Sequence, residues 1–249
     1  MNKLSIGGWI TAPHISIVDA TSASSLDWVC LDMEHSPAAN PDVLSFVTTV
    51  QARNKKAFVR LGMNDPHLFK YPLDSGIDGV IVPMVNSVVE AKLAIERCFY
   101  PPKGKRPVGL SRAHLYGFHF EEHMKANLES FQLIVQIEHI DAVDQIESIV
   151  ALEEVGGVFI GPYDLSSSMD IPGELENPKL LSAIEHVASV TKRSGKTLGA
   201  HVVWPDPEKV SHMAGLGYNF IAYSFDTMML LNTINSDLDR INQFTEASQ

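Results

Sequence analysis

Residues 28–37 read WVCLDMEHSP, an apolar run that turns abruptly into two carboxylates and an imidazole. The first four residues have the uniform hydrophobicity of a strand that is covered on both faces. Asp32, Glu34 and His35 then follow within four positions. Polar side chains that directly follow a buried strand are typical of parallel α/β folds, whose chemistry sits at the carboxyl ends of the strands. The stretch therefore predicts one part of a polar ring at such an edge.

Runs of the same kind recur along the whole chain. Eight of them are apolar or β-branched, at residues 5–10, 28–33, 56–61, 79–85, 133–138, 157–162, 198–203 and 220–225. Helix-like segments separate most of them, most clearly at 87–99, 139–155 and 177–195. No GxGxxG follows the first strand, which weakens the alternative of a doubly wound open sheet. We therefore predict an α/β fold, a single (β/α)8 TIM-barrel domain over residues 1–249.

Composition narrows the possible partners. The chain has 30 acidic and 19 basic residues and a net charge of −11, which argues against nucleic acid and anionic membranes as ligands. It has two cysteines, no secretory leader pattern and no apolar stretch near the roughly 20 residues of a membrane span. These features predict a cytoplasmic protein whose ligand is a small molecule and whose cysteines form no disulfide.

Two carboxylates end neighbouring predicted strands. Glu138 ends LIVQIE, and Asp164 follows VFIGP. Hard oxygen ligands with no cysteine and no clear histidine partner suit Mg²⁺ or Mn²⁺ better than zinc. The alternative is a pair of ordinary strand-end carboxylates that face water.

Arg60 and His35 are the candidate catalytic residues of this ring. Arg60 ends KAFVRL, where it could bind a carboxylate or stabilise oxyanion charge, or form an ion pair with Glu34 or Asp32. His35 could act as a general acid or base, or be a structural hydrogen-bonding group. Asp74, shortly before the fourth strand, could fix the tautomer of His35 as the third catalytic residue.

Lysine is absent from the predicted strand ends. A Schiff-base aldolase needs a desolvated lysine at the barrel mouth, but Lys56 begins its strand and Lys70 belongs to the following helix region. Carbonyl chemistry in this barrel would therefore depend on a metal ion.

Six motifs occur in one order along the chain: LDMEHSP, VRLGMNDP, VPMVNS, YPPKGKRPVG, VQIE and GPYDLS. Together they resemble the HpcH/HpaI family of metal-dependent class II pyruvate aldolases, over about Gly8 to Asp226. The resemblance implies a lyase that reversibly cleaves 4-hydroxy-2-oxo acids to pyruvate and an aldehyde, in the catabolism of aromatic compounds or sugar acids. It also implies a homo-oligomer, a hexamer or trimer of dimers, with C-terminal helices exchanged between subunits.

The resemblance assigns roles to the residues already singled out. Glu138 and Asp164 would hold the cation, which would be Mg²⁺, Mn²⁺ or Co²⁺, and Arg60 would contact the pyruvate oxygens. His35 and Asp74 would form an acid/base dyad, with Glu34 near the waters of the metal. The backbone N–H groups of Tyr163 and Asp164 would receive the pyruvate carboxylate.

Two departures from the family pattern lie beside this site. Tyr163 stands where the family has a smaller residue in G-P-A-D-L-S, and His139 replaces Thr after the metal-binding Glu. Both affect the shape of the pocket, so the aldehyde is left open. Two other functions also remain open: a CoA-thioester lyase of the citrate lyase β or malyl-CoA lyase type, served by a basic loop around Lys105, and a non-catalytic barrel that binds a metal–oxoacid complex.

Overall fold

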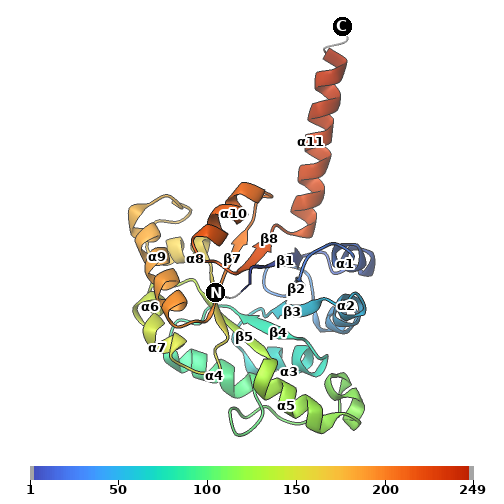
Figure 1. The fold of residues 1–249 in the computed structure, drawn as a ribbon, viewed down its shortest axis with the longest axis vertical. Coiled ribbons are helices and arrows are strands. Elements are labelled where there is room, and N and C mark those ends of the chain that lie inside the picture. The colour runs from blue at the N-terminus through green and yellow to red at the C-terminus, as the bar shows by residue number, and fades with distance from the viewer. Residues whose placement is uncertain (1–2, 247–249) are drawn as a thin grey trace.

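Eight parallel strands close into a barrel in the computed structural model, which describes residues 3–246 (Figure 1). Each strand pairs with its neighbours in chain order, and β1 pairs with β8. The strands are β1 (Ser5–Ile10), β2 (Trp28–Asp32), β3 (Lys56–Arg60), β4 (Gly79–Val82), β5 (Gln132–Ile137), β6 (Gly157–Ile160), β7 (Thr197–Val202) and β8 (Phe220–Tyr223). All eight predicted strands are therefore confirmed, with ends that shift by at most three residues.

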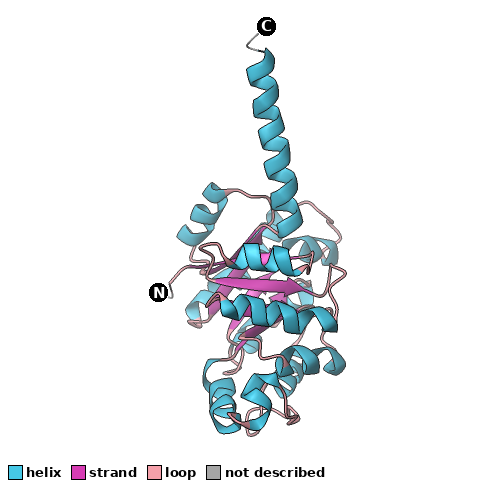
Figure 2. Cartoon of the chain, turned by 90° about the vertical axis from the view of Figure 1, so that its right-hand side faces the viewer, coloured by secondary structure: helices cyan, strands magenta, loops and turns pink. Residues whose placement is uncertain are grey.

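Helices surround the barrel (Figure 2). They are α1 (Ile15–Ser22), α2 (Asn40–Ala52), α3 (Pro66–Asp74), α4 (Val88–Cys98), the 3₁₀ segment η1 (Arg112–Gly117), α5 (Phe120–Ser130), α6 (Ile140–Asp144), α7 (Ile146–Val150), α8 (Pro162–Ser168), α9 (Pro178–Arg193), α10 (Pro207–Gly215) and α11 (Asp226–Glu246). The fold is a (β/α)8 TIM barrel, as the sequence predicts.

Helix boundaries follow local chemistry. In α9, the Asn177 side chain accepts the Lys179 N–H at 3.0 Å, and Gly195 adopts a φ of 74° just beyond the last turn, as a C-terminal glycine should. The single helix predicted over 139–155 is wrong. It divides into α6 and α7 because Gln145 leaves helical geometry, and its side chain accepts the Val88 N–H at the start of α4.

The barrel interior is filled by aromatic rings set against glycines. Trp28 stacks on Phe220 with ring centroids 4.0 Å apart, and Phe58 meets Trp28 edge-on at 5.6 Å. A Cβ atom on Gly7 would lie 2.0 Å from the Trp28 ring, so only glycine permits this packing. A second, larger apolar cluster packs the outer faces of the strands against the helices. Both cysteines are buried and free.

The C-terminal helix α11 projects away from the barrel (Figures 1 and 2). Its start is anchored, because the Asp226 carboxylate accepts the backbone N–H groups of Thr11 at 3.0 Å and Ala12 at 2.8 Å. The expected final helix is therefore present, and it begins at Asp226, earlier than the polar tail after Leu231 suggests.

Candidate active site

A cavity of about 560 Å³ opens where the strands end. Inward-facing residues of six strands line it, together with the first turn of α8, which carries Tyr163 and Asp164. The inward side chains alternate along each strand, so the polar ring and the aromatic interior come from the same face of the sheet. The strand-borne lining residues used below are Trp9, Asp32, Arg60, Gln136, Phe159 and His201.

Arg60 forms a bidentate ion pair with Asp32. Its Nε donates to Oδ1 at 2.9 Å and its Nη2 to Oδ2 at 2.7 Å. The two residues are register partners on β2 and β3, so the pair follows from the strand pairing. Burial opposes ionisation of Asp32, but Arg60 and the backbone N–H groups of Glu34 and His35 together outweigh burial and lower the pKa of the carboxyl. The ion-pair interpretation of Arg60 is therefore correct, and the same side chain also lines the cavity.

Glu34 shares the Arg60 guanidinium with Asp32. Its buried Oε2 accepts no hydrogen bond among the described residues, although Arg60 Nη1 lies 3.0 Å away. Burial raises the pKa of Glu34 to about 7, against the effect of Arg60 and with added repulsion from Glu138, Asp32 and Asp164. A cation would stabilise the charged form of a carboxyl that is crowded by three other carboxylates in this way.

Glu138 is only 2% exposed and is held by backbone and side chain. Met84 donates its N–H to Oε1 at 2.6 Å, and the Gln136 amide donates to Oε2. Met84 has a φ of 51°, a left-handed conformation that is uncommon for a residue with a side chain and that often occurs at functional sites. A Cβ atom on Gly161 would lie 2.9 Å from Oε2, so glycine lets the backbone approach this carboxylate. Burial raises the pKa of Glu138, and the Asp164 charge adds to it.

The carboxylates of this mouth fit a divalent cation. Four of them interact electrostatically around a single guanidinium: Asp32, Glu34, Glu138 and Asp164. No three His, Cys, Asp or Glu side chains among residues 3–246 form a ready metal cage. Mg²⁺ commonly takes one or two carboxylates and completes its shell with water and substrate oxygens. The predicted pair, Glu138 and Asp164, supplies that number.

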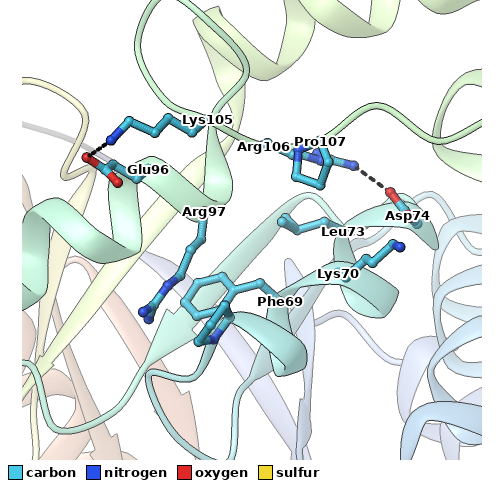
Figure 3. A pocket seen from close by; sticks show the side chains of 10 residues that line it. Phe69, Lys70, Leu73, Asp74, Glu96, Arg97, Lys105, Arg106 and Pro107 are labelled. Atoms are coloured by element: carbon cyan, nitrogen blue, oxygen red, sulfur yellow. Dashed lines mark hydrogen bonds and ion pairs between the residues drawn. The ribbon is translucent and has the colours of Figure 1, made fainter.

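His35 and Asp74 are not brought together within one chain. His35 lines the cavity with a side chain that is 66% exposed, and its Nε2 lies 3.9 Å from Glu34 Oε2. Asp74 ends α3 and precedes β4, which places it at the amino ends of the strands. There it accepts a hydrogen bond from Arg106 at 3.2 Å, in a separate cavity of about 240 Å³ between α3 and α4 (Figure 3). The predicted dyad therefore does not form within one chain, because a residue just before β4 lies at the amino end of the strands, away from the mouth.

Two polar residues of the mouth have no role in the sequence-based prediction. Gln136 is buried at 3% exposure and orients Glu138, and His201 stacks on Trp9 with ring centroids 5.0 Å apart. Both are polar residues at inward positions of otherwise apolar strands. Gln136 lies two residues before Glu138, and His201 lies two residues after Gly199, so each shares the inward face of its neighbour. That alternation was the available signal.

The basic loop that could serve a CoA phosphate is bonded to the protein itself. Lys103 pairs with Glu153 at 3.2 Å and Lys105 with Glu96 at 2.7 Å. Arg112 donates to the Ser75 carbonyl at 2.7 Å. None of these basic residues is among those that line the mouth cavity. Within residues 3–246, no helix has the length and apolar character needed to cross a bilayer.

Comparisons with known proteins agree with the fold and the motifs. The sequence model described as HpcH/HpaI aldolase/citrate lyase matches residues 5–233. A pyruvate aldolase of Rhizobium etli is 34% identical over 92% of this chain and 89% of its own length. A 2-keto-3-deoxy-L-rhamnonate aldolase of Salmonella gallinarum is 31% identical over 94% and 87%.

Solved structures point the same way. A crystal structure of a Burkholderia cenocepacia protein, described as an HpcH/HpaI aldolase/citrate lyase family protein, superposes with a TM-score of 0.90 at 27% identity. It covers 96% of this chain, which in turn covers 95% of it. The chain therefore belongs to the HpcH/HpaI aldolase/citrate lyase family.

Proposed function

We propose that this protein is a divalent-metal-dependent pyruvate aldolase that reversibly cleaves 4-hydroxy-2-oxo acids to pyruvate and an aldehyde. The observation that carries the proposal is the acidic cluster around Arg60 at the barrel mouth, together with the named aldolases among its relatives. None of the described residues that line the cavity is a lysine, so Schiff-base chemistry has no amine to use there.

Glu138 and Asp164 would hold the cation. An ion bound by them would polarise the pyruvate carbonyl as a Lewis acid, so that a methyl proton becomes acidic. The Met84 N–H and the Gln136 amide fix the Glu138 carboxylate before the ion arrives, which reduces the cost of ordering the ligand. Mg²⁺, Mn²⁺ and Co²⁺ are the candidate ions.

Arg60 would stabilise the charge that develops on the pyruvate oxygens. Asp32 holds two of its nitrogens, so the guanidinium reaches the cavity in one fixed orientation. A donor that is fixed in advance costs no reorganisation when the charge appears. The N–H groups of Tyr163 and Asp164 lie in the first turn of α8, where helical N–H groups have no partner within the helix, and they would bind the pyruvate carboxylate.

His35 would move the proton of the aldol hydroxyl. In synthesis the pyruvate enolate carbon attacks the aldehyde carbon, and the alkoxide formed takes a proton from His35, directly or through a water. In cleavage His35 removes that proton and the carbon–carbon bond breaks. Glu34, 3.9 Å from His35, would accept a hydrogen bond from it and complete the acidic surroundings of the ion, so this step does not use Asp74 of the same chain.

An exposed apolar stripe on α11 supports a homo-oligomer. Along α11, exposed apolar side chains recur every three or four residues, at Leu230, Ile234, Leu238 and Ile241. That spacing makes an apolar stripe that would be stable against another protein surface. We infer that α11 packs on neighbouring copies of the chain, in the predicted hexamer or trimer of dimers. A chain that ends before Leu230 should then lose this assembly in light scattering.

Two measurements test the function. Pyruvate methyl protons should exchange with D₂O in the presence of Mg²⁺ or Mn²⁺, and pyruvate with glycolaldehyde should give a product of the summed mass. Chelation should stop both reactions, and Asp164→Asn should weaken Mn²⁺ binding measured by calorimetry, while Glu185→Gln on the outer face of α9 should not.

The other functions give different results. Exchange that survives exhaustive chelation rules out the metal mechanism. Pyruvate binding without exchange favours the non-catalytic barrel, and condensation that requires acetyl-CoA favours the thioester lyase.

A further inference from the structure

His201 lies in the wall of the mouth, and the proposed mechanism gives this residue no role. It lies on β7, two residues beyond Gly199 and on the same inward face, and it lines the cavity. Its ring stacks on Trp9 at 5.0 Å and meets Phe225 edge-on at 6.4 Å. Trp9 in turn lies under the Arg60 guanidinium, with Cζ 5.1 Å from its ring centroid. His201 is therefore close to the reacting centre, on the side of an apolar wall.

One hydrogen bond fixes the tautomer of His201. Its Nε2 lies 3.0 Å from the backbone carbonyl oxygen of Ser224, at the end of β8. A carbonyl oxygen can only accept, so Nε2 must carry the proton. Ser224 has a φ of 55°, a left-handed conformation, and its own N–H donates to the Val202 carbonyl at 2.7 Å. The two strand ends thus present this carbonyl to the imidazole.

The ring remains neutral at working pH. Burial lowers the pKa of His201 to about 4, and the nearby Arg60 charge acts in the same direction against the Ser224 hydrogen bond. With its one proton on Nε2, the imidazole keeps a lone pair on Nδ1. Among the described residues Nδ1 receives no hydrogen bond. The mouth therefore contains a fixed acceptor that has no donor within residues 3–246.

We propose that His201 Nδ1 accepts a hydrogen bond from a hydroxyl group of the aldehyde, and so selects hydroxyaldehydes as the aldol partner of pyruvate. The inference rests on the proposed aldolase function and names its second substrate class. An acceptor nitrogen repels the carboxylate of a semialdehyde, which has no proton to donate. Arg60 is the only arginine or lysine among the described lining residues, and Asp32 and Glu34 already pair with it.

The rest of the wall suits a small hydroxylated chain. Trp9, Phe159 and Phe225 supply apolar surface for its carbon atoms. Thr11 and Thr227 add two hydroxyl groups to the same cavity, 3.2 Å apart. A site built to hydrogen-bond a substrate hydroxyl discriminates against analogues that lack it, because the buried acceptor is then left unpaired.

Glycolaldehyde and propionaldehyde test this directly, because they differ by a hydroxyl in place of a methyl group. We expect the ratio of their kcat/KM values, with saturating pyruvate and Mg²⁺, to fall by about tenfold in His201→Phe, the loss of one neutral hydrogen bond. Comparing ratios between enzymes cancels the different intrinsic reactivity of the two aldehydes. In the same variant, the kcat/KM value for succinic semialdehyde should rise relative to that for glycolaldehyde.

Matched variants separate this role from a structural one. His186→Phe makes the same change on the outer face of α9, and it should leave the ratio unchanged. His201→Asn, whose amide oxygen can still accept, should retain part of the preference. His201→Leu tests the same point should the phenyl ring not fit against Trp9.

The ¹⁵N spectrum of histidine-labelled protein adds a readout that needs no turnover. The signal that disappears in His201→Phe should show a protonated Nε2 and an unprotonated Nδ1 at neutral pH. A proton on Nδ1, or an aldehyde ratio that stays at the wild-type value in His201→Phe, overturns the proposal for His201. Wild-type protein that exchanges no pyruvate protons overturns the aldolase itself and this substrate class with it, so the two failures are distinct.

Discussion

Trp28 and Asp32 lie four residues apart on one strand, and both point into the barrel, yet they do opposite things. Trp28 is 1% exposed and stacks on Phe220, whereas Asp32 is 2% exposed and is bound to Arg60. The aromatic layer removes apolar surface from water, which stabilises the fold. The charged layer places carboxylates and a guanidinium where water is scarce, which costs stability and creates reactivity. The two layers share one alternation and differ only in their height along the strand.

The largest expected effect comes from the charged layer. Glu138→Gln should lower kcat/KM for pyruvate and glycolaldehyde by at least about 10³-fold, more than the loss of a single oxyanion donor, because one of the two cation ligands is lost. Stability should be unchanged or higher, since burial disfavours the charged form of this carboxyl. Turnover and thermal unfolding in the same buffer check this, with Glu185→Gln as the control. Loss of folding together with activity would mean that Glu138, like Trp28, mainly stabilises the fold.

Arg60 tests whether one residue can serve both catalysis and stability. Arg60→Met should lower kcat by about 10²–10³-fold, because charge on the pyruvate oxygens loses its donor. It should also destabilise the protein by about 3–5 kcal/mol, because the buried Asp32 carboxylate loses the cation that pairs with it. Urea unfolding of Arg60→Met and of the double variant Arg60→Met/Asp32→Leu separates the two effects. The double variant should regain stability without activity, and regained activity would contradict the role given to Arg60.

The aromatic layer should show the reverse pattern. Trp28→Ala should lower the free energy of unfolding by about 3–5 kcal/mol, because the ring leaves a cavity against Phe220 and Phe58. Turnover per folded molecule should stay within a few-fold of wild type at a temperature where the variant is folded. Trp204→Ala, which removes a ring that is 64% exposed, is the matched control. Equal destabilisation by both substitutions would refute the packing account.

The smallest effect is a change in pH dependence. Glu34 has a pKa of about 7 in the folded, metal-free protein, against an ordinary value of 4.5. Between these values the folded state holds a proton that the unfolded state has released, so the free energy of unfolding falls as pH rises. The slope from this group is at most about 1.4 kcal/mol per pH unit.

Glu34→Gln should remove that slope. Urea unfolding at pH 5, 6 and 7 with a chelator present measures it. His201 contributes with the opposite sign below its ordinary pKa of 6.5, because its folded pKa is lowered, so only the difference between wild type and variant isolates Glu34. An unchanged slope in Glu34→Gln would mean that this carboxyl is ionised in the fold.

Local pattern predicted much of this architecture because a buried parallel strand is a short, uniform signal. The run WVCLD and its seven counterparts predicted the number of strands, and the polar residues near the ends of these runs predicted part of the set that reaches the mouth. Gln145 escaped prediction because the apolar periodicity of 139–155 continues through the break. Only its bond to Val88, 57 residues away, marks the place where α6 ends and α7 begins.

Asp74 shows the same limit at the site. Its place in the sequence, before β4, put it at the amino end of the strands but did not specify its partner there. Arg106 became that partner through the packing of a loop against α3, at the end of the barrel away from His35. A dyad depends on how two distant segments pack, so the sequence around either residue does not predict it.

The sequence by itself determined the barrel and the strand ends that carry Glu138, Asp164 and Arg60, because alternation and strand termination are local properties of the chain. The tertiary structure decided which groups neutralise which. Closure of the sheet set the Asp32–Arg60 register pair, turned the Met84 N–H toward Glu138 and gave His201 its tautomer through Ser224. Those outcomes depend on distances between strands far apart in sequence, and Coulomb and hydrogen-bond energies are set by such distances.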